Sequence, residues 1–237
     1  MHASGLQVKV PGIVGGMGSL STVDFLQKVV SLTKADKDQD HLKMVVDFNT
    51  AVPDRTTALL YGGEDPTPYL VDSVNRLAKA GADFAVFICN TAYAFLEKVR
   101  KQAVIPVLNL PELTVERLCK KGIKRFWLTG TKGLIKSGVY QVAAEKFNVE
   151  ILIPTEEVQD NLMTIIYSVK AGNVEKAKKV WEEAVEPKLE GYVLLGCTEL
   201  PVVARSERLK LIDVNLEWAK IVIELCGKAV KEDETGV

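Results

Sequence analysis

Two cysteines stand at equivalent points of an internal repeat. Residues 81–91 read Gly-Ala-Asp-Phe-Ala-Val-Phe-Ile-Cys-Asn-Thr, and residues 190–198 read Glu-Gly-Tyr-Val-Leu-Leu-Gly-Cys-Thr. In each segment an apolar run leads to a cysteine, Cys89 or Cys197, with a threonine close behind. Thiols with a reference pKa of about 8.5 can act as general acids and bases near neutral pH. The repeat therefore indicates proton-transfer chemistry by a pair of thiols.

The position of these cysteines predicts that they share a site. A residue that directly follows a buried parallel strand lies at the carboxyl edge of the sheet, where ligands bind. The N-terminus of a following helix favours the thiolate. Pseudo-twofold symmetry between the two halves would make Cys89 and Cys197 face each other across a cleft. In contrast, Cys119 and Cys226 lie inside helical patterns, and we expect both to be small core residues.

Three other features are open to two interpretations each. The turn 15–18, Gly-Gly-Met-Gly, offers backbone donors to a carboxylate or is simply a tight turn, and it lacks the spacing of a nucleotide-binding loop. Arg55 provides a planar fork for a carboxylate or forms a surface salt bridge. Lys170 lies at the end of a predicted helix, where a cation also favours the dipole. The residues alone leave these alternatives open.

Composition sets the bounds for the class of protein. The chain has 237 residues, of which 47% are hydrophobic, and its 30 Lys and Arg nearly balance its 31 Asp and Glu. This balance argues against a nucleic-acid or anionic-membrane partner. We expect no membrane span, because no apolar stretch approaches about 18 residues, and no export signal. Four dispersed cysteines fit a reducing cytoplasm. Neither His2 nor His41 has the setting of a ligand or a base, and no metal-binding spacing is present.

Alternating apolar runs and amphipathic segments predict an α/β fold. We expect two pseudo-symmetric doubly wound domains, each with a mostly parallel sheet flanked by helices, and an active site in the cleft between them. The predicted domains are 1–110 plus 208–237, and 111–207. The final helix, 216–230, is expected to pack on the first half. The predicted strands are 9–14, 44–48, 84–88, 106–108, 126–129, 150–153, 192–195 and 209–213.

The motifs along the chain resemble those of the aspartate/glutamate racemase superfamily, and most closely its aspartate racemase branch. The two cysteine motifs together are specific to the superfamily, and Pro-Asp-Arg with Lys-Ala-Gly-Asn favours the aspartate branch. The resemblance runs from about residue 10 to about 214. The matching segments are 15–18, 53–55, 63–66, 89–92, 129–131, 137–140, 170–173 and 196–200.

This resemblance implies a homodimer that racemises amino acids without pyridoxal phosphate, metal or any other cofactor. It implies that Cys89 and Cys197 are the two catalytic bases, and that Arg55 and Lys170 bind the side-chain carboxylate of a dicarboxylic amino acid. The α-carboxylate would be held by Asn90, Thr91, Thr131 and Thr198, with the backbone around Met17 and Gly18. Glu199 is a further substrate-binding residue that the resemblance implies.

Two positions depart from the pattern of the relatives. Tyr93 stands where relatives commonly have His, and Ser19 stands where many have Pro. A phenol with a pKa of about 10 cannot carry protons as an imidazole does at neutral pH, so an assisting role for residue 93 is in doubt. The sequence predicts an aspartate racemase; the alternatives are a glutamate or broad-specificity racemase, a thiol-dependent isomerase or decarboxylase, and a non-catalytic binder of acidic amino acids.

Overall fold

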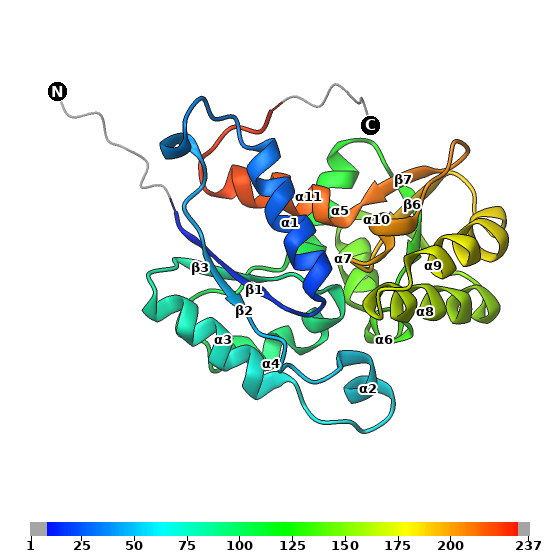
Figure 1. Cartoon of the computed structure of the whole chain (residues 1–237), viewed down its shortest axis with the longest axis horizontal. Coiled ribbons are helices and arrows are strands. Elements are labelled where there is room, and N and C mark those ends of the chain that lie inside the picture. Colours follow the sequence, from blue (N-terminus) through cyan, green and yellow to red (C-terminus); the bar gives the residue numbers. More distant parts are fainter. Residues whose placement is uncertain (1–8, 232–237) are drawn as a thin grey trace.

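The computed structural model describes residues 9–231, whose strands form two parallel sheets (Figure 1). The first sheet has the order β2-β1-β3 and the second the order β5-β4-β6-β7, with parallel pairing throughout. This confirms the predicted α/β class. The strands are β1 (Pro11–Gly15), β2 (Val45–Phe48), β3 (Phe84–Phe87), β4 (Arg125–Thr129), β5 (Glu150–Leu152), β6 (Tyr192–Leu195) and β7 (Lys210–Asp213).

The apolar runs predicted these strands to within two residues, with one exception at 106–108. There the structure has an isolated parallel bridge between Ala85 and Val107 instead of a strand. The Ala85 N–H donates to the Pro106 carbonyl, and the Leu108 N–H donates to the Ala85 carbonyl. Because Pro106 has no N–H, it cannot extend this pairing into a longer ladder.

Helices cover both sheets. In the first half these are α1 (Ser19–Leu32), α2 (Arg55–Leu60), α3 (Thr67–Lys79), the 3-10 helix Asn90–Phe95 and α4 (Leu96–Arg100). In the second half they are α5 (Leu110–Lys120), α6 (Lys132–Ser137), α7 (Val139–Phe147), α8 (Glu156–Lys170), α9 (Val174–Val180), the π-helix Trp181–Val185 and α10 (Leu200–Val203). The last helix is α11 (Val214–Leu225), and short 3-10 turns occur at Asp38–Asp40 and Glu186–Lys188.

Helix α8 shows how local sequence fixes an element. Its N-cap Thr155 accepts a hydrogen bond from the Val158 N–H, which satisfies one of the free donors at the helix start. The predicted apolar face is buried, because Leu162, Ile165, Ile166 and Val169 are all fully inaccessible. Burial of one such side chain contributes about 1.5–3 kcal/mol. This face anchors α8 so that its last residue, Lys170, lies at the edge of the second sheet.

The chain ends by crossing between the two halves. Strand β7 pairs with β6, so residues 210–213 belong to the second sheet, whereas the sequence pattern grouped 208–237 with the first half. Helix α11 then packs along α1, as Figure 1 shows. It also contacts α5, where Trp218 Nε1 donates to Thr114 Oγ1 at 3.0 Å. One helix thus packs on both halves, and the division into two domains stays a prediction.

No helix within residues 9–231 is long and apolar enough to cross a membrane. The same residues contain no cluster of His, Cys, Asp and Glu side chains that could hold a metal ion. His2 lies outside the described residues.

Candidate active site

The carboxyl ends of the two sheets border a common cavity that holds both predicted thiols. Cys89 follows β3 and Cys197 follows β6, and both line this cavity, which we call the catalytic cavity. Each predicted site residue lines it except Gly18, which lines an adjoining cavity. The lining residues are Met17, Asp54, Arg55, Thr56, Cys89, Asn90, Thr91, Thr131, Lys170, Gly196, Cys197, Thr198 and Glu199.

Helical segments follow both cysteines. Cys89 precedes the 3-10 helix Asn90–Phe95, which runs directly into α4, and Cys197 lies three positions before the four-residue α10. Besides these helix ends, each sulfur has a charged neighbour, Arg55 for Cys89 and Glu199 for Cys197.

Cys197 is paired with a carboxylate. Its Sγ–H donates to Glu199 Oε2 at 2.8 Å, and both residues are more than nine-tenths buried. Burial, followed by the negative charge of Glu199, raises the pKa of Cys197 well above its ordinary value, and Lys170 offsets only part of this. Cys197 is thus held as a protonated thiol at neutral pH.

Glu199 depends on a glycine for its position. A Cβ atom at Gly18 would lie 2.6 Å from Glu199 Oε1, well inside van der Waals contact. Thr198 Oγ1 lies 3.4 Å from the other carboxylate oxygen, Oε2. Within residues 9–231, Oε1 is buried without a hydrogen-bond partner. The structure therefore places Gly18 beside the site as the residue that leaves room for Glu199.

Cys89 is paired with a cation. Its neighbour Arg55 is 7% exposed and is anchored by backbone carbonyls: one amino group donates to Val52 and Pro53, at 3.1 and 3.0 Å, and the other to Met17 at 2.9 Å. The resemblance gave Arg55 the role of holding a substrate carboxylate. These bonds use three of the five N–H donors of the guanidinium group, and within residues 9–231 Arg55 Nε has no hydrogen-bond partner.

The charge of Arg55 acts on the thiol side of the cavity. Burial by itself lowers the pKa of Arg55, but contact with the Cys89 sulfur and the charges of Asp54 and Glu199 hold it above its ordinary value. Lys170 behaves similarly: burial lowers its pKa, whereas Glu199, Cys197 and Cys89 raise it above the ordinary value overall. Both cations consequently remain charged beside the sulfurs.

Lys170 is the more available of the two cations. It is exposed, and its Nζ lies 5.5 Å from the centre of the Tyr167 ring. Within residues 9–231, no backbone carbonyl accepts a hydrogen bond from its ammonium group, unlike the guanidinium of Arg55. Its long side chain can therefore turn toward a ligand in the cavity.

Residues of the two halves meet at the cavity. Thr91 Oγ1 lies 2.9 Å from Thr131 Oγ1, which also accepts the Leu134 N–H at 3.0 Å as the N-cap of α6. Nearby, a Cβ at Gly133 would lie within 3.1 Å of three atoms of Thr56. A residue larger than glycine at position 133 would therefore push α2 and α6 apart.

Sequence reasoning assigned no role to Tyr140, although it lies in one of the matching motifs. Its buried Oη donates to Asn90 Oδ1 at 2.6 Å. This bond orients the Asn90 amide, whose Nδ2 is buried and, within residues 9–231, has no hydrogen-bond partner. Because Asn90 lines the catalytic cavity, its amide can supply two donors there. Burial raises the pKa of Tyr140 well above its ordinary value, so the phenol stays a donor.

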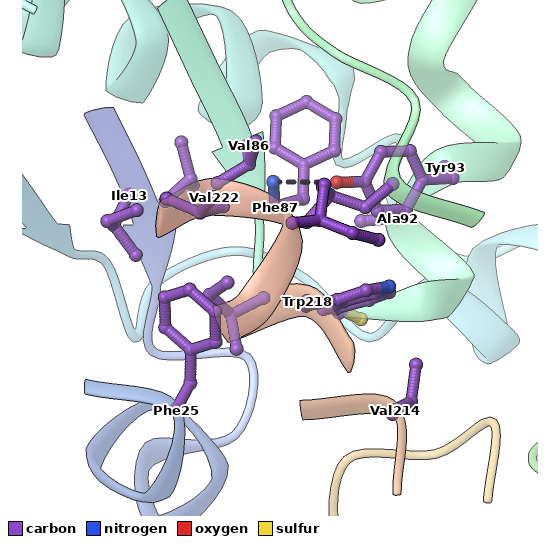
Figure 2. Close-up of a cluster of buried hydrophobic side chains, with 14 of the residues drawn as sticks. Ile13, Phe25, Val86, Phe87, Ala92, Tyr93, Val214, Trp218 and Val222 are labelled. Carbon is purple, nitrogen blue, oxygen red and sulfur yellow. Dashed lines mark hydrogen bonds between the residues drawn. The ribbon is translucent and has the colours of Figure 1, made fainter. Parts of the chain in front are cut away.

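Tyr93, which replaces the His of relatives, belongs to the core. Its ring packs against the rings of Phe87 and Trp218, with centroid distances of 5.3 and 5.9 Å. Figure 2 shows the three side chains. Its Oη accepts the Phe87 N–H at 3.1 Å. Tyr93 is 4% exposed and does not line the catalytic cavity. Desolvation raises its pKa above the ordinary value, and the residue therefore acts in packing.

The other two cysteines lie away from the cavity. Cys226 is buried in the core, and desolvation raises its pKa to about 12. Cys119 is partly exposed at the edge of the same core, where Lys124 Nζ lies 2.8 Å from its sulfur. This separates the cavity pair from the remaining thiols.

Two parallel α/β sheets with a cysteine cavity at their carboxyl ends define the two-domain racemase fold. The chain belongs to the Asp/Glu/hydantoin racemase family, whose model matches residues 14–222. It is similar to the aspartate racemase of Picrophilus torridus, with 31% identity, a TM-score of 0.82, and coverage of 94% of this chain and 96% of that chain.

Curated relatives include enzymes with other substrates. A broad-specificity amino-acid racemase of Bacillus subtilis (strain 168) is 26% identical over 221 residues, which span 90% of this chain and 96% of the relative. A glutamate racemase of Aquifex aeolicus (strain VF5) is 32% identical over 155 residues, which span 62% of this chain and 58% of the relative.

Proposed function

We propose that the protein is an amino-acid racemase that interconverts L- and D-aspartate by proton transfer between the α-carbon and two thiols, without a cofactor. The observation that carries this proposal is that Cys89 and Cys197 line one cavity, from opposite halves of the chain, with neighbours of opposite charge. Inversion at carbon requires a base on one face and an acid on the other, and this arrangement supplies both.

The neighbours of the two sulfurs suit two different roles. Cys197, hydrogen-bonded to Glu199, is the proton donor, and Cys89, in contact with Arg55, is the base that removes the α-proton. After one turnover the two cysteines have exchanged the roles of proton donor and base. The enzyme is then ready to racemise the product in the reverse direction. Lys170, near both sulfurs, balances the negative charge that passes from one sulfur to the other.

The carbanionic intermediate needs donors directed at the α-carboxylate, because the negative charge spreads onto it. The free amide of Asn90 and the hydroxyls of Thr91, Thr131 and Thr198 line the cavity and meet this need. Lys170 is the group that we assign to the side-chain carboxylate of aspartate. Arg55 supports it by charge while its amino groups hold the loop at Met17.

The similarity to a broad-specificity racemase and to glutamate racemases favours a second candidate, a racemase for glutamate or several amino acids. A non-catalytic binder of acidic amino acids is the alternative from another class. We also propose that the protein is a homodimer, because the family resemblance implies it, and that it is cytoplasmic, because its four cysteines are dispersed. The balanced charge argues against a nucleic-acid or membrane partner.

Incubation of the protein with L-aspartate in heavy water separates these candidates. A racemase exchanges the α-hydrogen for deuterium, seen by proton NMR, while the optical rotation decays to zero. Exchange without inversion, or no change at all with bound aspartate, would refute the proposal. The matched control is Cys119→Ala, which removes a thiol outside the cavity and is expected to behave like the unmodified protein.

A further inference from the structure

A second cavity adjoins the catalytic one and is large enough for a side chain. We call it the outer pocket; its volume is about 370 Å³, within the usual range of about 300–1,000 Å³ for small-molecule sites. The catalytic cavity itself has a volume of only about 10 Å³ around the thiols, about one water molecule. The residues that line only the outer pocket are Gly16, Gly18, Ser19, Leu20, Thr50, Val52 and Val169.

The two cavities share a wall of charged side chains. Asp54, Arg55, Lys170 and Glu199 line both. Two carboxylates offset two cations, so the wall is nearly neutral when all four groups are ionised. An amino acid whose side chain passes this wall therefore needs no negative charge besides its α-carboxylate. Lys170, whose side chain is exposed and long, is the part of the wall that can turn aside.

Beyond the wall, the outer pocket offers apolar surface. Leu20, which is 55% exposed at the first turn of α1, supplies the accessible part of it, whereas Val52 is only 6% exposed and Val169 is fully buried. Burial of apolar surface against such side chains contributes about 25 cal/mol per Å². The aliphatic side chain of a ligand would therefore pack against Leu20, and both would lose contact with water.

We propose that the outer pocket is a side-chain subsite, which lets the protein bind and racemise neutral aliphatic amino acids longer than aspartate, such as methionine and leucine. The α-carbon lies between the thiols and the side chain extends past Lys170 toward Leu20 and Val52. This inference rests on the proposed racemase function. It adds a substrate class to that function, because aspartate itself ends at the charged wall.

The test compares two tryptophan variants on the same helix. Leu20→Trp fills the outer pocket, whereas Val23→Trp places the same ring on α1 at a residue that is 54% exposed and does not line the pocket. Exchange of the α-hydrogen in heavy water is followed for L-aspartate, L-methionine and L-leucine. Thermal melting of each variant establishes that it is folded.

We expect kcat/KM for methionine and leucine, divided by kcat/KM for aspartate, to fall at least tenfold in Leu20→Trp and to stay within twofold in Val23→Trp. Ser19→Trp, at an exposed residue on the pocket rim, should lower the ratio in the same direction.

Other outcomes overturn the inference in distinguishable ways. If aspartate is exchanged but methionine and leucine are not, the subsite is refuted and the proposed racemase stands. If all three are exchanged but Leu20→Trp leaves the ratio unchanged, the outer pocket is only an entrance. If none of the three is exchanged, the proposed function fails and the subsite fails with it.

Discussion

The surroundings of the two thiols differ although their positions in the fold correspond. Cys89 and Cys197 each lie two residues after the end of a strand, yet one lies beside the guanidinium of Arg55 and the other donates to the carboxylate of Glu199. Equivalent positions give access to the same cavity from two sides. The unlike neighbours place a cation beside one sulfur and a carboxylate beside the other. A repeated motif can thus supply symmetry of position while unrelated residues supply asymmetry of charge.

Removal of one of the two thiols is expected to have the largest effect on activity. Cys89→Ala and Cys197→Ala are each expected to lower racemisation by about 10³-fold or more, because a general acid or base typically contributes about 10²–10⁴-fold. The remaining thiol still faces one side of the α-carbon. Each variant should therefore exchange the α-hydrogen of one enantiomer of aspartate, and the two variants should act on opposite enantiomers in proton NMR. Equal exchange of both enantiomers by one variant would refute the two-thiol scheme.

The asymmetry of charge is tested by Glu199→Gln. This change keeps the shape of the side chain beside Gly18 but removes the charge that, after burial, raises the pKa of Cys197. The pKa of Cys197 should therefore fall. In the direction of racemisation in which Cys197 donates its proton, the basic limb of the pH profile of kcat/KM should move to lower pH. Loss of a charged hydrogen-bond partner is expected to lower kcat/KM by about 10- to 100-fold.

The opposite direction of the reaction is the internal control for that variant. There Cys89 donates the proton, and its neighbour Arg55 is unchanged. A basic limb that moves equally in both directions, or in neither, would contradict the assignment of Glu199 to Cys197.

A smaller effect is expected at Tyr140, which orients Asn90 on the Cys89 side. Tyr140→Phe removes the donor to Asn90 Oδ1 and frees the amide to rotate, so KM for aspartate should rise about tenfold, the equivalent of about 1.4 kcal/mol. Isoasparagine, which has an amide in place of the α-carboxylate, should bind with little change. Tyr61→Phe is the matched control, because Tyr61 is 71% exposed. An equal loss of affinity for both ligands would indicate a merely structural role.

The smallest effect on activity is expected at Tyr93, which lies near Cys89 in sequence but in the core. Tyr93→Phe leaves the Phe87 N–H without its acceptor, and the free energy of unfolding should fall by about 1–3 kcal/mol. The kcat/KM for aspartate should stay within twofold, and urea denaturation measures the stability. A large loss of activity with unchanged stability would place Tyr93 in the proton pathway.

Much of the fold follows from local pattern. The continuous apolar run of β3 and the buried face of α8 are each visible in a few residues, and the structure has them where the sequence predicts. The pairing of β7 with the second sheet was missed, because an apolar run does not indicate which neighbour it will join. The sequence also offered Arg55 and Lys170 as residues that could bind an anion. It did not indicate that Arg55 donates hydrogen bonds to three backbone carbonyls.

The local sequence was enough to predict that two cysteines, each after an apolar strand within a repeat, lie at the sheet edges where ligands bind, and the structure places both in one cavity. Which charge lies beside each sulfur, which donor has no partner and which residues line the site follow from the three-dimensional packing. Asn90 and Tyr140 are 50 positions apart, and Gly18 and Glu199 come from opposite ends of the chain. Such contacts arise from the packing of whole elements, and no local pattern of residues encodes them.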